Sequence, residues 1–540
     1  MPSVSIEHFG GMQPAVDNRS GQETDAALAV DVNLYDGVLR PLRSPKLCDT
    51  KAFDVKGMAL IPHMHGENYG LMAWSDCTRW VPKAAIAALS GRTVPLVLRS
   101  GRLFWVDPSD HDNLVSVSVD APTTAPIVTV LSPGVGTVED RLYTFTYVNA
   151  WGVESPPAPV TAAYTVADDG SVLLSGLGGA PANATHMRIY RSVGKFEDGR
   201  QAPNTAEGSF QLVRQVPVAA IFTDNYTLLD AHFGTLMTDA ECPPPLMDNV
   251  VGTEGGWLVG FKGNELFVSY RHMAHNWPTQ NRLTLPDKIV NIVATGDVVY
   301  VVTEGNPYYV KLAYDKEVDI IEPVAFDEPY PCIAPDSLVS APTGALYATG
   351  RGLVLLTPQR PAHLISKDRI PEDAWGDFAP NLAVWHRGSY YGFRSPESGG
   401  FIMDINEPSE GQIAIGEITR HTVNIDAAHA GHDGVLYVAR GGGIYRWGKG
   451  DARPYTWKSR VISANAPTAM NTLRLLADYG PAVNVKVWAD GKLVCDKTVT
   501  DMKPSRLGRF GRAREFTIQL QGVTPVYDVK LATSAKELRE

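Results

Sequence analysis

The chain has 540 residues, of which 44% are hydrophobic and 20% charged, so it has the composition of a globular protein too long for one core, and we expect two to four domains. Its net charge of −11 argues against sequence-specific binding of nucleic acid, which needs Lys and Arg to neutralise phosphates. No apolar run is long enough to span a membrane, and no secretion signal is visible, so we expect synthesis in a cytoplasm.

Turn-forming residues are frequent, with 49 Gly and 39 Pro spread along the whole chain, which favours an all-β protein with many hairpins. The five cysteines never have C-x-x-C spacing and are odd in number, which argues against a disulfide scaffold. We expect them to be reduced and mostly buried; they are Cys48, Cys77, Cys242, Cys332 and Cys495.

Residues 1–56 form the first segment, for which we expect irregular structure with one short helix over 24–37. In 57–120 apolar and polar residues alternate with period two between Gly and Pro, which predicts antiparallel strands. We interpret these strands as one or two early units of the repeat described below.

The pattern of apolar residues and turn residues changes over 121–239. The stretch YTFTYVNAWGVESPP, residues 143–157, resembles the middle strands of a fibronectin type III domain, with alternating aromatics, a Gly turn and Glu-Ser-Pro. We therefore expect an inserted fibronectin III-like sandwich, a prediction that concerns fold and not chemistry.

Three stretches within 339–447 repeat a pattern of an apolar strand, a turn and an apolar or aromatic pair. The pairs begin at Leu346, Tyr390 and Leu436, which are 44 and 46 residues apart. A period of about 40–50 residues made of short strands is typical of β-propeller blades, which must stack to bury both faces.

Two further pairs, at Leu266 and Val299, are 33 residues apart, so the repeat is imperfect. We expect a discontinuous propeller of five to seven blades in 57–120 plus 240–455. Longer alternating strands without the repeat pattern predict a C-terminal β-sandwich in 456–540.

The sequence contains no motif that points to catalysis, a cofactor or a metal, and we predict no enzyme and no catalytic, cofactor-binding or metal-binding residue. GxxxxGK[ST], GxSxG and HExxH are absent, and the glycine-rich stretch near 440 opens no expected helix. Two histidine pairs, His63 with His65 and His272 with His275, lack Cys or carboxylate partners at ligand spacing.

Acids at turns are candidates for cleaving glycans, and aromatic residues in turns are candidates for binding them. The acids Asp297, Glu304, Asp404 and Asp433 stand beside Gly or Asn or near turns, where solvated acids normally lie. Tryptophans in expected turns offer surfaces for stacking on sugars or anchoring partner proteins; they are Trp151, Trp277, Trp375 and Trp447. For Trp257, Trp385 and Trp488, within strand patterns, we prefer packing in the core.

Four stretches, in order, resemble the tail nozzle proteins (tail tubular protein B type) of short-tailed bacteriophages. They are FGGMQPAVDN with LYDGVLRPLRSP near the start, LFVSYRHMAHNWP, EPYPCIAPDSLVSAPTGALYATGRGLVLLTP, and ADGKLVCDKTV with EFTIQLQGVTPVYDVKLATSAKEL at the end. The resemblance covers most of the chain apart from 121–235.

The resemblance implies a structural virion protein that forms a ring, commonly of six copies, at the tip of the tail. Such a ring continues the DNA ejection channel from an upstream adaptor or tail tube protein, anchors tail fibres or spikes, and passes double-stranded DNA non-specifically. A carbohydrate-binding or depolymerising tail protein acting on host surface glycans is the alternative, and an intracellular bacterial propeller scaffold is a third.

Overall fold

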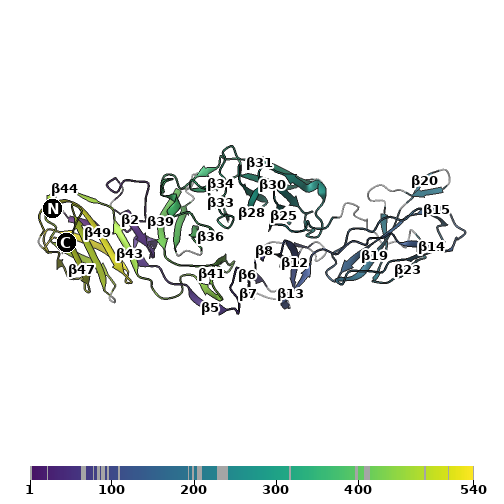
Figure 1. Cartoon of the computed structure of the whole chain (residues 1–540), viewed down its shortest axis with the longest axis horizontal. Helices are drawn as coiled ribbons and strands as arrows, with labels where there is room; N and C mark the ends of the chain where they lie inside the picture. Colours follow the sequence, from purple (N-terminus) through teal and green to yellow (C-terminus); the bar gives the residue numbers. More distant parts are fainter. Residues whose placement is uncertain are drawn as a thin grey trace.

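The computed structural model describes residues 3–538 apart from short stretches. Those outside the description are 21, 23, 63–68, 77, 82–84, 87–91, 94–95, 108–109, 193, 198–199, 204–209, 228–240, 316–317, 396–398, 407–413, 479–481 and 509. The described chain is all-β and consists of many small sheets, joined by turns and short 3-10 segments (Figure 1). Its described part has no helix long and apolar enough to cross a membrane.

Four-stranded antiparallel sheets follow one another in chain order through the middle of the molecule. The first three are β24 (Asn249–Gly252), β25 (Leu258–Lys262), β26 (Glu265–Val268) and β27 (Arg282–Thr284); β28 (Ile289–Thr295), β29 (Val298–Thr303), β30 (Tyr308–Asp315) and β31 (Val318–Ala325); and β32 (Val339–Ala341), β33 (Gly344–Ala348), β34 (Leu353–Leu356) and β35 (His363–Leu364). The next four strands are β36 (Leu382–His386), β37 (Ser389–Phe393), β38 (Gly400–Asn406) and β39 (Ala414–His421), and they form one end of a ten-stranded sheet that continues through β39 into the end of the molecule that holds the termini.

The sheet after these takes a strand from the beginning of the chain. Its strands are β40 (Ala427–Ala430), β41 (Leu436–Arg440), β42 (Gly443–Arg446) and then β5 (Lys46–Thr50), which pairs with β42. Two earlier sheets precede the insert: β6 (Gly57–Pro62) with β7 (Tyr69–Trp74), and β8 (Arg79–Val81) with β11 (Leu96–Arg99), β12 (Arg102–Asp107) and β13 (Asp110–Ser116). A small hairpin of β9 (Ala85–Ile86) and β10 (Arg92–Thr93) lies between β8 and β11 in sequence.

The first strands of these seven sheets contact one another in a closed cycle, and we call the set the sheet ring (Figure 1). The cycle runs β6, β8, β24, β28, β32, β36, β40 and back to β6. Neighbouring sheets share apolar clusters; Met58 and Leu60 of β6, for example, pack with Tyr437 and Ile444 from the sheet that β5 completes. The two ends of the ring sequence are thus joined through contacts between residues almost 400 positions apart.

The repeat is more regular than the apolar pairs indicated. Leu346, Tyr390 and Leu436 all lie on the second strand of their sheets, whereas Leu266 lies on the third strand, β26. The 33-residue spacing therefore compared non-equivalent strands, and the second strand of that sheet, β25, begins at Leu258.

Residues 127–224 form a separate group of sheets at one end of the elongated molecule (Figure 1). The sheets are β14 (Ile127–Ser132), β18 (Ser171–Ser175) and β23 (Ile221–Asp224); β16 (Tyr143–Asn149), β19 (Ala184–Ser192) and β22 (Phe210–Pro217); and β17 (Tyr164–Ala167), β15 (Val138–Arg141), β21 (Arg200–Pro203) and β20 (Gly194–Glu197). These sheets share a hydrophobic core of their own, which includes Tyr143, Phe145 and Leu174 and is distinct from the apolar clusters of the sheet ring.

The opposite end combines the last strands with the first ones (Figure 1). One sheet has the order β1 (Ser3–Ile6), β50 (Val526–Ala532), β45 (Thr472–Ala477) and β48 (Ser505–Arg506). The other extends from β39 through β2 (Ala26–Val30), β43 (Tyr455–Ser459), β49 (Ala513–Gly522), β46 (Val483–Ala489) and β47 (Lys492–Val499), with β44 (Ile462–Thr468) also beside β49. We call these two layers the terminal sheet pair.

The expectation for residues 1–56 was wrong in its secondary structure. Instead of a helix over 24–37, the chain forms β2, β3 (Val32–Asn33) and a 3-10 turn at Tyr35–Gly37, and β3 pairs with β4 (Arg40–Pro41). The segment is not irregular, because it gives strands to the terminal sheet pair and to the sheet ring. Pairing of β2 with β43 supplies backbone hydrogen bonds that override the weak helix preference of its alanines.

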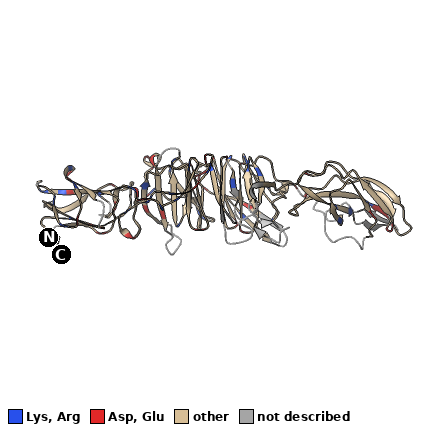
Figure 2. Ribbon diagram, turned by 90° about the horizontal axis from the view of Figure 1, so that it is seen from below, with Lys and Arg blue, Asp and Glu red and all other residues tan. Residues whose placement is uncertain are grey.

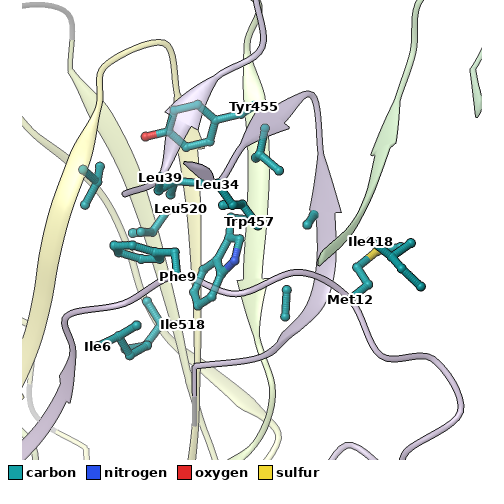
Figure 3. Packing of buried hydrophobic residues seen from close by; sticks show 14 of the residues in the cluster. Ile6, Phe9, Met12, Leu34, Leu39, Ile418, Tyr455, Trp457, Ile518 and Leu520 are labelled. Atoms are coloured by element: carbon teal, nitrogen blue, oxygen red, sulfur yellow. The ribbon is translucent and has the colours of Figure 1, made fainter. Parts of the chain in front are cut away.

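Aromatic packing fixes the first residues against the terminal sheet pair (Figure 3). The rings of Phe9 and Trp457 meet edge to face with centroids 5.0 Å apart, and Trp457 Nε1 donates to the Gly10 carbonyl over 3.1 Å. Both rings are fully buried, so this contact ties the start of the chain to β43.

Candidate functional surfaces

An ion pair spans the axis of the sheet ring. Arg79 begins β8, and Asp336 precedes β32 and bridges to Leu382 of β36. In the cycle of first strands, β32 and β36 are the two opposite β8, yet Arg79 Nη2 lies 3.3 Å from Asp336 Oδ1. The two side chains therefore meet across the middle of the ring, and the pair remains partly exposed to solvent.

Buried asparagines join neighbouring sheets beside this pair. Asn249 Nδ2 donates to Asn291 Oδ1 over 2.7 Å, and Asn291 Nδ2 donates to the Pro335 carbonyl over 2.7 Å. Each Oδ1 also accepts the next backbone N–H, from Val250 and Ile292, at 2.9 Å. In the sequence these residues are marked only by a polar residue near the start of successive first strands, a pattern that catalytic and metal-binding motifs do not include.

A polar cavity of about 230 Å³ lies where the first residues cross β39. Two carboxylates line it: Asp25 accepts from Gln13 Nε2 at 3.0 Å, and Glu417 accepts the backbone N–H of Gly11. Burial raises the pKa of Glu417. Both acids are engaged in holding the backbone of residues 10–26, so the cavity has the polar lining of a joint between segments rather than an open groove.

The acids weighed for glycan chemistry have structural partners. Asp404 is half-buried on β38, and this partial burial raises its pKa; it accepts from the Ser389 hydroxyl at 2.6 Å. Asp433 accepts from the Tyr437 hydroxyl at 2.8 Å, and Asp297 accepts the backbone N–H of Gly255 at 2.5 Å. Glu304 is at an exposed turn beside Lys288, 3.3 Å away. These contacts hold turns and strands and do not converge on one groove.

The histidines do not gather with other ligands in the described structure. His63 and His65 lie outside the described residues. His272 and His275 share a turn after β26, and burial lowers the pKa of both, to about 4 for His275. Among the residues that the structure describes, no group of three His, Cys, Asp or Glu side chains is placed to hold a metal ion.

The tryptophans proposed as stacking surfaces are largely packed inside, which corrects that interpretation. Trp277 and Trp375 are each 1% exposed, and their Nε1 groups donate to the carbonyls of Ala274 and Thr349, both over 2.8 Å. Trp151 packs between the core of the 127–224 sheets and the cluster of the neighbouring ring sheets. Trp447 packs edge to face against the rings of Tyr391, Phe393 and His421.

The strand tryptophans and cysteines mostly follow expectation. Trp257 is buried, while Trp385 and Trp488 are half-buried, with Lys458 above the Trp488 ring at 4.8 Å. Cys332 and Cys495 are buried and Cys242 half-buried, but Cys48 is exposed on β5; Cys77 lies outside the described residues. Burial raises the pKa of Cys242 and Cys332 to about 11, which makes both thiols poor nucleophiles.

Comparisons with known proteins identify no family for this chain. No protein-family model and no curated protein match the sequence. Among solved structures, the Pan2 WD40 domain of Neurospora crassa is 8% identical, with 75% of this chain and 97% of that chain covered and a TM-score of 0.25. A streptogramin B lyase is 10% identical, with coverage of 59% and 97% and a TM-score of 0.24.

Hsv2 of Kluyvelomyces marxianus is 8% identical over 55% of this chain and 90% of its own, with a TM-score of 0.22. With TM-scores of 0.22 to 0.25, these structures carry no argument about the fold of this chain or about its activity.

Proposed function

We propose that this chain is a structural subunit of the tail nozzle of a short-tailed bacteriophage. In this proposal the sheet ring is a seven-bladed β-propeller, residues 121–239 form a fibronectin III-like insert, and 456–540 form a β-sandwich completed by β1. The closed cycle of first-strand contacts and the use of β5 to complete the last blade support the propeller.

The observation that carries the proposal is the arrangement of the modules. Three β modules lie in line, with the sheet ring in the middle and its axis spanned by Arg79 and Asp336 (Figure 1). Such a body offers long lateral surfaces for packing beside identical copies around a common axis. The four stretches that resemble nozzle proteins lie in the terminal sheet pair and in the sheet ring, and so belong to the two modules that form this frame.

The Arg79–Asp336 ion pair also bears on where DNA would pass in the proposed nozzle. The major groove of B-DNA alone is about 12 Å wide, so a duplex needs far more room than a ring whose opposite walls meet through two side chains. We therefore propose that the channel lies between copies of the chain, along the axis of their assembly. A lumen surrounded by subunits of net charge −11 would repel phosphates and let the genome slide without adsorbing.

In this role the chain meets an upstream adaptor or tube protein and carries fibres or spikes, and the outward insert is available to fibres or the host surface. Antibodies against the purified chain should label the distal tail tip of intact particles in negative-stain images. Particles that never carry the label, together with a purified chain that never joins tails, would contradict the proposal. Loss of viscosity of host polysaccharide on incubation with the chain would favour the depolymerase instead.

A further inference from the structure

The outer surface of one terminal sheet carries polar and aromatic side chains that the nozzle proposal does not use. On β43 and β49, alternate residues point into the core, among them the fully buried Trp457, Ile518 and Leu520 (Figure 3). The residues between them point away from the core, and we call this set, with its neighbours on β46 and β47, the outer face. All are half-buried or exposed; they are Thr456, Lys458, Asn484, Lys486, Trp488, Leu493, Asp496, Thr517, Gln519 and Gln521.

One row of the outer face presents an amide between two ammonium groups. Strand register aligns, on β43, β49, β46 and β47 in that order, Lys458, Gln519, Lys486 and Asp496. Lys486 Nζ lies 3.5 Å from Asp496 Oδ2, whereas the Gln519 amide has no hydrogen-bond partner among the described residues. The donor and the acceptor of Gln519 are therefore available to a ligand.

An indole ring lies beside this row. Trp488 of β46 stands opposite Thr517 of β49 and Leu493 of β47, and Leu493 is 52% exposed. Lys458 Nζ lies over the Trp488 ring, 4.8 Å from its centroid, although β49 separates their two strands. The two side chains therefore reach toward each other above β49, the strand that carries Gln519.

This combination of groups matches the surface of a sugar polymer. Amide and hydroxyl groups both donate and accept, so they can bond to sugar hydroxyls. An aromatic ring offers a flat apolar surface on which the C–H face of a sugar packs. A flat sheet face fits an extended chain, whereas small molecules bind in concave pockets.

The outer face belongs to the module that holds both termini. Figures 1 and 2 show from two directions that this module ends the molecule on the side opposite the 127–224 sheets. Those sheets therefore do not cover the outer face.

We propose that the outer face binds an acidic polysaccharide. Trp488 stacks on a sugar ring, the Gln519 amide bonds to its hydroxyls, and Lys458 pairs with its carboxylate. A sugar that stacks on the ring face under Lys458 displaces that ammonium, and only a sugar with a negative group offsets the lost cation–π contact with an ion pair. This inference goes beyond the proposed nozzle function and does not rest on it, and it concerns binding and not cleavage.

Single-stranded nucleic acid is the competing occupant, because bases also stack on aromatic rings. It is less favoured because the outer face has two cations and one acid, whereas binding of a phosphate backbone needs a track of cations. A protein partner would need a larger apolar centre than Trp488 and Leu493 provide.

The test uses the full chain and an array of bacterial surface polysaccharides, acidic and neutral, with single-stranded DNA as a further probe. The unchanged chain should bind acidic polysaccharides more tightly than neutral ones. Added salt should narrow this difference, because it screens the exposed ion pair.

Two substitutions separate stacking from charge. Trp488→Ala should weaken binding about thirty-fold, the loss expected of an aromatic anchor, and Trp488→Phe should recover most of it. Lys458→Gln should weaken binding of acidic chains about five-fold without weakening that of neutral chains. The matched controls should bind like the unchanged chain; they are Trp385→Ala, at a half-buried strand position of the sheet ring, and Lys492→Gln, at an exposed position of β47 off the outer face.

Thermal unfolding shows whether each variant is folded, and if Trp488→Ala does not fold, Gln519→Ala and Lys458→Gln carry the test. An unchanged chain that binds no acidic polysaccharide of the array would overturn the inference, as would binding that survives both Trp488→Ala and Gln519→Ala. Binding of single-stranded DNA that Trp488→Ala abolishes, with no binding of polysaccharide, would assign the face to nucleic acid. Each of these outcomes leaves the nozzle proposal standing, because tail labelling tests that separately.

Discussion

His421 is a titratable group enclosed by aromatic rings. It is 2% exposed on β39, with its ring centroid 4.9 Å from Phe393 and 5.5 Å from Trp447. Its Nε2 lies 3.2 Å from the Gly392 carbonyl, an arrangement that suits a neutral imidazole donating one hydrogen bond. Burial lowers the pKa of His421 to about 4, because the charged form would lose its hydration.

This shift predicts acid sensitivity of the sheet ring. The folded pKa lies below the ordinary value, so the stabilising effect is complete above about pH 6.5 and is lost as the pH falls toward 4. His421→Phe should remove about 1.4 kcal/mol per pH unit from the slope of the unfolding free energy between pH 6 and 4.5. Urea unfolding at a series of pH values measures this, and an unchanged slope would contradict the buried neutral histidine.

Asn291 is the second residue whose loss should be costly. Replacing it by Ala removes the acceptor of Asn249 and the donor to Pro335, and leaves the buried Asn249 amide without this partner. We expect a loss of about 2–3 kcal/mol of unfolding free energy. Asn381→Ala serves as the control, because the two hydrogen bonds that Asn381 makes with the Ser395 backbone are exposed to solvent, and it should cost much less; equal losses would show that burial of the Asn249–Asn291 bridge adds nothing.

At the scale of elements, the sequence pattern predicts those strands whose formation depends on residues close in the chain. The strands that carry Leu346, Tyr390 and Leu436 were found because alternation and turns within about twenty residues fix them. The pairing of β5 with β42 could not be predicted, since strand partners about 400 residues apart leave no mark in the local pattern. The same limit explains the helix expected over 24–37, where pairing with β43 decides the structure.

For the candidate sites too, the sequence shows local signals but not the tertiary contacts that decide whether a residue is exposed. Tryptophans in turns were expected at the surface, but Trp277 and Trp375 belong to turns that fold back on the core, and only the tertiary structure reveals this. The Arg79–Asp336 pair depends on which sheets face each other across the ring, which sequence spacing does not encode.

The β5 strand should hold the sheet ring closed. Leu47 lies opposite Tyr445 of β42, so Leu47→Cys with Tyr445→Cys, in a Cys48→Ser background, places two thiols across the ladder. Oxidation closes a loop of nearly 400 residues and should raise the unfolding free energy by about 3–5 kcal/mol over the reduced form. Thermal unfolding of the two forms of the same protein makes the comparison. Equal melting temperatures would mean that β5 detaches before the ring unfolds.

At the scale of the whole molecule, the insert is attached through more than its two connecting chains. Trp151 belongs to the apolar contacts of both the 127–224 sheets and the neighbouring ring sheets. His275, in a ring turn, feels the charges of Glu154 and Arg188 from the insert, which places the three groups near one another. The 127–224 sheets therefore have an apolar contact with the ring at Trp151, which favours a defined orientation over a freely jointed one.

The ion pair across the ring gives the last prediction, which concerns the path of DNA through the assembled particle. If the chain forms the proposed nozzle and the genome passes between copies, locking the axis of each sheet ring changes nothing in ejection. Arg79→Cys with Asp336→Cys puts two thiols at the ends of that span, and a short bis-maleimide can join them permanently. Particles reconstituted with the cross-linked chain should eject DNA at the rate of particles carrying the same variant without the linker. A block to ejection that appears only with the linker would place the duplex inside the single-chain ring, against the width argument, and would move the proposed channel from the assembly axis to the axis of the sheet ring.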